Sequence, residues 1–368
     1  METGQALRGK NVFVTGHTGF KGSWLLMMLH RLGARVTGYS LQPPTKPSLF
    51  EAAGLVQFVA SHHEADIRDS CRLAAAVKAA KPDLVLHLAA QSLVRKSHRK
   101  PLETFSTNVM GTAALLDAVR LLNAPCAVVV VTSDKCYEPR DDGQPNVESD
   151  PMGGRDPYSA SKGAAELVTA AYRRSYFPQE RHASHGVQLA TVRAGNVIGG
   201  GDWAEDRIVT DIVRHLMAGK PVPVRHPTAV RPWQHVLEPL VGYLTLAQLM
   251  LTTPSPLWCT GWNFGPAFGD DITVRELTET FIDAWGAGSW LNAHDQHAPI
   301  ETHVLRLAVD KAATQLPWKP RFDARQAIRR TAAWFRAFAA DPTSARSLCN
   351  ADILAYHEMD LLLARRDM

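Results

Sequence analysis

The chain has 368 residues, of which 45% are hydrophobic and 21% charged, and its formal net charge at pH 7 is +4. This composition excludes an intrinsically disordered chain, and the small basic excess, with no basic run, argues against nucleic-acid binding. The longest apolar stretch near the N-terminus, Trp24 to Leu29, is far shorter than the roughly 20 residues of a membrane span. The five cysteines are scattered without a C-x-x-C pair, which argues against a disulfide framework or a metal site and favours a reducing cytoplasm.

Short β-branched runs alternate with helical patterns over the first 193 residues. We expect strands at 12–14, 35–39, 84–88, 127–131 and 189–192, and helices at 24–32, 70–80, 101–122 and 158–176. Continuous apolar strands separated by helices are typical of a parallel sheet covered on both faces. The sequence therefore predicts an α/β fold with a doubly wound, Rossmann-type parallel sheet.

The pattern changes after Arg193. Residues 195–203 are rich in glycine, 219–232 are rich in proline, and helical patterns dominate from Thr273 onward. We expect a second, smaller mixed α/β domain that binds the substrate and comprises 194–235 and 266–368. The helical stretch and apolar run within 236–265 are expected to return to the first domain, residues 1–193. Residues 342–350 are predicted to form a loop before a last helix at 353–365.

A glycine-rich turn, Thr15 to Gly22, follows the first strand and opens the first helix. Gly16, Gly19 and Gly22 allow a tight turn and close approach of the backbone to a pyrophosphate at a helix N-terminus. The turn therefore predicts dinucleotide binding, with Phe20 among the contacts. Asp66 and Ile67, after the next short strand, suit either an adenine contact or a solvated loop. No acidic residue follows the second strand at Ser40, so the strand itself does not distinguish NAD from NADP.

Tyr158 and Lys162 carry the strongest chemical signal. Four residues apart on a helix, the phenol and the ammonium lie on one face, and a nearby cation favours the phenolate. A phenolate placed in this way accepts the proton of a hydroxyl group while hydride leaves for a nicotinamide. Thr132 and Ser133 lie at the carboxyl end of a buried strand, where open α/β sheets bind ligands.

These features resemble the extended short-chain dehydrogenase/reductase family over roughly residues 10 to 340. His87 to Gln91 is similar to the family segment beside the nicotinamide, which implies a cofactor contact for Ala89 and a substrate contact for Gln91. Asn108 matches the structural asparagine that supports the catalytic lysine through water. Asp310 to Ala312 and Leu316 to Pro320 resemble the late signature of members that act on nucleotide sugars.

Six further segments resemble the nucleotide-sugar 4,6-dehydratases of this family, in the branch that acts on CDP-glucose. They are Thr15 to Trp24, Pro43 to Phe50, Thr132 to Glu138, Asp150 to Lys162, Arg193 to Trp203 and Arg231 to Val236. The dTDP-glucose and GDP-mannose branches carry an Asp-Glu or a Ser/Thr-Glu pair after the catalytic hydroxyl residue, where this chain has Asp134-Lys135. Lys135 is either a general base or a solvated lysine at the strand end.

The resemblance implies a lyase that uses NAD and forms CDP-4-dehydro-6-deoxy-D-glucose and water. Tyr158 would accept the C4 hydroxyl proton, with Ser133 or Thr132 bonded to the new carbonyl. Asp134 would protonate the departing C6 hydroxyl, and Lys135 would remove the C5 proton. Asn196, Arg207 and Arg231 suit diphosphate contacts, although either arginine also suits a surface ion pair.

Two other readings of the sequence stay open. An epimerase or decarboxylase of nucleotide sugars would share Tyr158 and Lys162, and a non-catalytic dinucleotide sensor would share only the fold. We further expect a homodimer, formed through the helices at 101–122 and 158–176, with no metal, nucleic acid or membrane partner.

Overall fold

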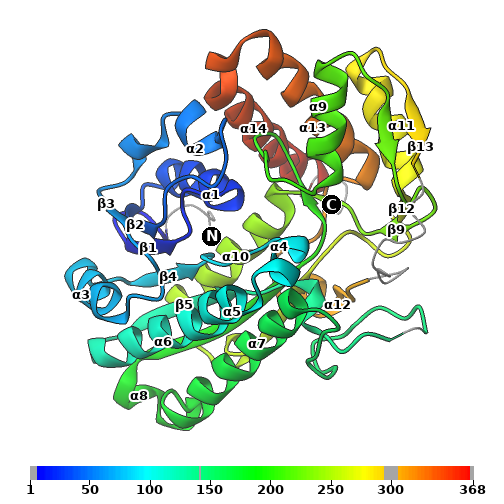
Figure 1. The fold of residues 1–368 in the computed structure, drawn as a ribbon. Helices are drawn as coiled ribbons and strands as arrows, with labels where there is room; N and C mark the ends of the chain where they lie inside the picture. Colours follow the sequence, from blue (N-terminus) through cyan, green and yellow to red (C-terminus); the bar gives the residue numbers. More distant parts are fainter. Residues whose placement is uncertain (1–5, 141, 294–305, 365–368) are drawn as a thin grey trace.

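A seven-stranded parallel sheet forms the centre of the computed structural model, which describes residues 6–140, 142–293 and 306–364 (Figure 1). The strand order is β11-β6-β5-β4-β1-β2-β3, and all neighbours are parallel. The strands are β1 (Asn11–Thr15), β2 (Arg35–Ser40), β3 (Ser61–Glu64), β4 (Leu84–His87), β5 (Cys126–Val131), β6 (Val187–Ala194) and β11 (Gly261–Phe264). The predicted doubly wound fold is confirmed.

Helices cover both faces of this sheet because alternate strand residues point to opposite sides. On one side, Val85 and Val128 pack in a core with α3 (Ser70–Ala80), α6 (Gly111–Leu122) and α7 (Pro157–Ser175). On the other side, Leu84 and Val129 pack in a core with α1 (Phe20–Arg31) and α10 (Leu237–Thr252). Both faces are therefore dry, as a parallel sheet requires.

Smaller elements connect the sheet to the rest of the chain. The short helices are α2 (Leu49–Ala52), α4 (Val94–Arg99), α5 (Pro101–Phe105) and α8 (His182–His185). The helix predicted over 101–122 is interrupted by a π-helical turn at Ser106–Met110. The first helix begins at Phe20 rather than at Trp24, because Gly19 supplies the extended residue that precedes it.

Three two-stranded sheets and several helices form the remaining described part. The sheets pair β7 (Val197–Ile198) with β10 (Gln234–His235), β8 (Val222–Val224) with β13 (Trp290–Asn292), and β9 (Val230–Arg231) with β12 (Ile272–Thr273). The helices are α9 (Ile208–Met217), α11 (Val274–Trp285), α12 (Asp310–Gln315), α13 (Ala324–Ala340) and α14 (Ala345–Ala364). None of the described helices is long and apolar enough to cross a membrane.

The C-terminal helix differs from the sequence prediction. We expected a loop over 342–350, but α14 begins at Ala345. Ala345, Cys349, Ile353 and Tyr356 are all buried, and their spacing places them on one helical face against the core. The polar residues between them concealed this periodicity, and packing against α13 fixes the helix.

Candidate functional site

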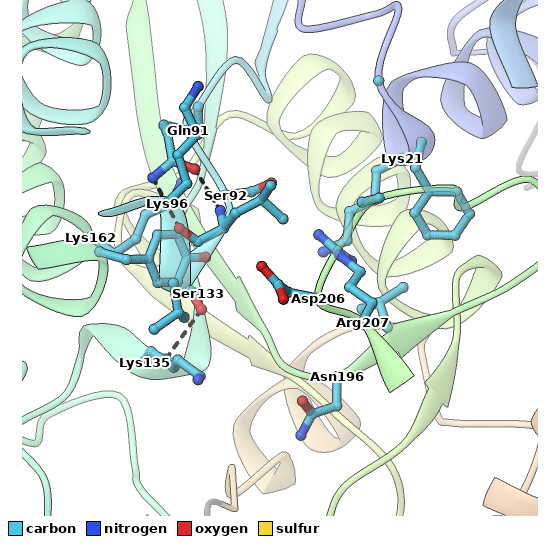
Figure 2. Close-up of a pocket in the computed structure, with 18 of the residues that line it drawn as sticks. Lys21, Gln91, Ser92, Lys96, Ser133, Lys135, Lys162, Asn196, Asp206 and Arg207 are labelled. Atoms are coloured by element: carbon cyan, nitrogen blue, oxygen red, sulfur yellow. Dashed lines mark hydrogen bonds between the residues drawn. The ribbon is translucent and has the colours of Figure 1, made fainter. Parts of the chain in front are cut away.

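A cavity of about 1000 Å³ opens at the carboxyl ends of the central strands. Its walls come from the loops after β1, β4 and β5, from the first turns of α7, and from residues 194–209 and 223–233. Crevices at this edge are where open α/β sheets bind ligands. Figure 2 shows Ser133, Lys135 and Lys162 on one side, and Lys21, Asp206 and Arg207 on the other.

The glycine-rich turn has the shape that a dinucleotide pyrophosphate needs. Gly16 has φ +74°, and a Cβ there would lie 2.7 Å from the backbone nitrogen of Ala89. A Cβ on Gly22 would overlap the carbonyl oxygen of Gly16. Gly19 precedes α1, so the free N–H groups of that helix face the cavity. These residues fit a dinucleotide cofactor, and Phe20, Ile67 and Ala89 line the same cavity.

Asp66 also lines the cavity, but its carboxylate is engaged. It accepts hydrogen bonds from the backbone and the guanidinium of Arg68, the shortest at 2.6 Å, and this bonding lowers the pKa of Asp66. The contact between Asp66 and adenine stays a prediction, and it would involve a carboxylate that already pairs with Arg68.

Gln91, which lines the cavity, is bonded to Asn108 behind it. The Asn108 side chain accepts from the Gln91 backbone at 2.8 Å, and donates to the Gln91 carbonyl at 3.0 Å and to the Ser161 hydroxyl at 2.8 Å. Asn108 thus ties the π-helical turn to the catalytic helix α7. The Gln91 side-chain amide bonds to Thr104 and Leu93, so its geometry holds the loop after β4 in place.

Tyr158 and Lys162 lie buried in the first turns of α7. Asp156 caps this helix, since its carboxylate accepts from the Ser159 backbone at 3.0 Å, and Pro157 begins it. Burial raises the pKa of Tyr158 to about 12, and the nearby Ser133 hydroxyl opposes this rise. Burial lowers the pKa of Lys162 to about 8, and its ammonium donates to the Val131 carbonyl at 3.2 Å.

The hydroxyl groups of Ser133 and Thr132 bond to different partners. The Thr132 hydroxyl donates to Glu166 at 2.5 Å, and Glu166 also accepts two bonds of 2.8 Å from Arg193. The Ser133 hydroxyl instead donates to Asp134 Oδ1 at 2.8 Å. The geometry therefore favours Ser133 among the two hydroxyl residues that the sequence left open.

Asp134 and Lys135 form a short turn directly after Ser133. Asp134 is buried, whereas Lys135 is half-buried, and both line the cavity. The Lys135 backbone donates to the Ser133 hydroxyl at 3.2 Å, which fixes the turn (Figure 2). A carboxyl group and an amine thus line the same cavity as the Tyr158 phenol.

The opposite wall carries the predicted diphosphate contacts. Asn196 has φ +40°, and its buried amide nitrogen has no hydrogen-bond partner in the described part of the chain. Arg207 pairs with Asp202 at 2.9 Å, and Arg231 donates to the Val230 carbonyl at 2.9 Å. All three line the cavity, as does Lys21, a residue that the sequence reasoning missed. Burial, with Arg207 nearby, lowers the pKa of Lys21 to about 8.

Residues 12–253 match the model of the NAD-dependent epimerase/dehydratase family. The chain belongs to this family. Within the family, it is 49% identical over 332 residues to a CDP-glucose 4,6-dehydratase of Salmonella typhimurium, which covers 90% of this chain and 92% of that protein. It is 33% identical over 260 residues to a dTDP-glucose 4,6-dehydratase of Streptomyces antibioticus, covering 70% and 71% of the two chains.

Solved structures of epimerase/dehydratase proteins share the fold. The dTDP-glucose 4,6-dehydratase DesIV of Streptomyces venezuelae, solved with NAD and TYD bound, superposes with a TM-score of 0.73 at 25% identity, covering 90% and 99% of the chains. The epimerase Mth375 of Methanothermobacter thermautotrophicus has a TM-score of 0.77 at 21% identity, covering 93% and 96%. The latter likeness concerns the fold alone.

Proposed function

We propose that the protein is an NAD-dependent 4,6-dehydratase that converts CDP-D-glucose to CDP-4-dehydro-6-deoxy-D-glucose and water. One observation supports this function above others: the Ser133 hydroxyl, which lies near the Tyr158 phenol, is bonded to both residues of the Asp134-Lys135 turn. An epimerase needs Tyr158 but has no use for an acid and a base beside it. The 49% identity to a CDP-glucose 4,6-dehydratase supports the same substrate.

The glycine-rich turn, Ala89 and Lys162 would hold the cofactor, which when bound takes hydride from C4 of the sugar and returns it at C6. Tyr158 accepts the C4 hydroxyl proton, and the Ser133 hydroxyl bonds to the new carbonyl oxygen. The ketone acidifies the C5 hydrogen, which Lys135 removes. Asp134 donates a proton to the C6 oxygen, which leaves as water. Lys135 finally returns the proton to C5.

The proposed cycle also needs a group that returns a proton to Asp134, and Ser133 suits this role. Over one cycle Tyr158 gains the C4 hydroxyl proton, while Asp134 loses one proton to the departing water. Because the Ser133 hydroxyl bonds to Asp134 and lies near the Tyr158 phenol, we assign it the return of the proton from Tyr158 to Asp134. The cycle then closes without a proton from the solvent.

The substrate diphosphate carries negative charge, and the wall opposite Tyr158 is basic. Arg207 and Arg231 line this wall, and the unpartnered amide of Asn196 adds a neutral donor. Arginine suits the task because its planar guanidinium bonds two phosphate oxygens at once. We assign these three residues to the diphosphate.

The test is to incubate purified protein and NAD with CDP-, dTDP-, UDP- and GDP-glucose and to assay the alkaline chromophore of a 4-keto-6-deoxy sugar. We expect the chromophore with CDP-glucose, no net NADH, and loss of product in Tyr158→Phe. A CDP-hexose epimer without chromophore would contradict the dehydratase and support an epimerase. NADH formed in step with product would indicate a simple dehydrogenase.

We also propose that the chain forms two domains. Residues 1–193 with 236–265 would bind the cofactor, and residues 194–235 with 266–368 would bind the substrate.

A homodimer is proposed through α6 and α7, because Leu121 and Leu167 on these helices are 60% and 61% exposed. Sedimentation of a monomer at micromolar concentration would refute the dimer. The five free cysteines agree with a cytoplasmic location, which fractionation of the source cells would test.

A further inference from the structure

Three buried polar atoms near the Asp134-Lys135 turn have no hydrogen-bond partner among the described residues: Asp134 Oδ2, Gln234 Oε1 and the Tyr243 hydroxyl. The three residues are 3%, 1% and 0% exposed. Nearly all buried polar atoms in proteins are bonded, so each of these atoms needs a reason. Neither Gln234 nor Tyr243 has a role in the proposed reaction steps of Tyr158, Ser133, Asp134 and Lys135.

Gly195 joins Gln234 to Asp134. The Gln234 amide nitrogen donates to the Gly195 and Phe264 carbonyls, each at 3.0 Å. The Asp134 carboxyl group also lies against Gly195, so closely that a Cβ on Gly195 would overlap Asp134 Oδ2. The two bonds fix the amide, and its carbonyl oxygen is the atom left to accept a hydrogen.

Tyr243 lies on α10, which packs against β5 just before the turn, and it is near enough to Asp134 for the charge of that carboxylate to affect its pKa. Its ring packs on Phe264, the residue that also accepts from Gln234, with centroids 5.5 Å apart. Burial raises the pKa of Tyr243 far above its ordinary value, and the nearby charges of Asp134 and Tyr158 raise it further. The phenol therefore keeps its proton and acts only as a neutral hydroxyl.

The Gln234 carbonyl and the Tyr243 hydroxyl suit the protonated and the ionised state of the Asp134 carboxyl group, respectively. Ser133 occupies Oδ1, so Oδ2 is the atom that remains for other partners. While the carboxyl group holds its proton, an acceptor such as an amide carbonyl suits it. Once the proton has left, a donor such as a phenol stabilises the carboxylate.

We propose that Gln234 and Tyr243 are positioning residues for Asp134 in the elimination of water. This inference rests on the proposed function. The proton of Asp134 goes to the C6 oxygen as the C6–O bond breaks, and the electron pair of that bond leaves with water. Gln234 holds the carboxyl group before the transfer, and Tyr243 stabilises the carboxylate after it.

Tyr243→Phe tests the proposal, because it removes one oxygen and keeps the ring. We expect water elimination to slow by about 10- to 100-fold, the range of a hydrogen bond to a charged group. The KM for CDP-glucose and the exchange of the C5 hydrogen with D₂O should stay unchanged. The melting temperature should not fall, because an unpartnered hydroxyl is lost. Tyr137→Phe is the matched control, since its buried hydroxyl is bonded to Arg193 and Asn263 and its loss should lower the melting temperature.

The variant is then combined with Asp134→Asn. If Tyr243 acts through Asp134, Tyr243→Phe should cause no further slowing in that background. The inference is overturned if Tyr243→Phe eliminates water at the wild-type rate, if it slows C5 exchange and elimination equally, or if its effect persists in Asp134→Asn. Failure of the proposed function is a separate outcome, because the wild-type protein would then give no chromophore from CDP-glucose.

Discussion

Burial is the dominant influence on the pKa values of Lys21, Tyr158 and Lys162 in the cavity wall. It raises the pKa of Tyr158 to about 12 and lowers that of Lys162 to about 8, so both groups are driven toward their neutral forms. A phenol in this state is a weak base. The positive charge of Lys162 and the Ser133 hydroxyl must therefore favour the phenolate when the substrate is oxidised.

The proposed role of Lys135 as the base that removes the C5 proton can be tested by a single substitution. Lys135→Met should still oxidise C4 but should stall, because the ketone cannot lose its C5 proton. We expect a loss of turnover on the order of 10²- to 10⁴-fold, the contribution of a positioned proton transfer. Single-turnover mixing should show NADH that persists, with little C5 exchange from D₂O.

Lys96→Met provides the comparison for this variant. Lys96 also lines the cavity, but its ammonium pairs with Glu103 at 2.7 Å. Its loss should leave C5 exchange intact. Wild-type elimination by Lys135→Met would show that Lys135 is only a solvated lysine.

At the scale of elements, one buried ion pair joins the catalytic helix to the sheet. Glu166 of α7 accepts from Thr132 at the end of β5, from Thr191 of β6 at 2.7 Å, and from Arg193. Arg193 also donates to the Tyr137 hydroxyl at 2.6 Å. Burial raises the pKa of Glu166, but its bonds to Arg193 outweigh this and the net shift is downward.

Removing one partner of the Glu166–Arg193 pair should leave the other partner as an unpaired buried charge. Glu166→Ala is expected to lower the free energy of unfolding by about 3–5 kcal/mol. The double variant Glu166→Leu with Arg193→Met should recover most of this loss, because no charge stays buried. Urea unfolding of the single and double variants measures both effects. Equal destabilisation by the two would contradict this account of the pair.

At the scale of the whole molecule, Glu238 joins the sheet layer to the C-terminal helices. Glu238 lies on α10 and is fully buried. It accepts from the backbones of Arg321 and Phe322 at 3.1 Å and 2.8 Å, and from the Tyr356 hydroxyl of α14 at 2.6 Å. Burial raises the pKa of Glu238 to about 7.

A pH dependence of stability follows from this raised pKa. Between the ordinary value of 4.5 and about 7, the folded protein binds a proton that the unfolded chain has released. This contribution is complete below 4.5 and is lost as the pH rises through about 7. We expect Glu238→Gln to flatten this part of the stability profile, by an amount on the order of 1–3 kcal/mol. Urea midpoints on both sides of this interval measure it, and an unchanged profile would exclude Glu238 as the cause.

The sequence by itself determined the parallel sheet, the glycine-rich turn and the Tyr158–Lys162 pair. These features depend on local patterns: apolar runs, residues without a Cβ, and a spacing of four on one helix. The sequence also predicted Asp134 and Lys135 through their resemblance to known dehydratases, but it left Ser133 and Thr132 as alternatives.

Only the tertiary structure decided how distant residues share one site. The Thr132 hydroxyl is bonded to Glu166, which lies 34 residues away, and α14 begins early because its buried face packs on α13. Gln234 and Tyr243 had no local signal, since a buried glutamine and a helix tyrosine have no chemistry until a carboxyl group lies beside them. Such contacts depend on long-range packing, which determines burial and hydrogen-bond partners that local sequence patterns do not encode.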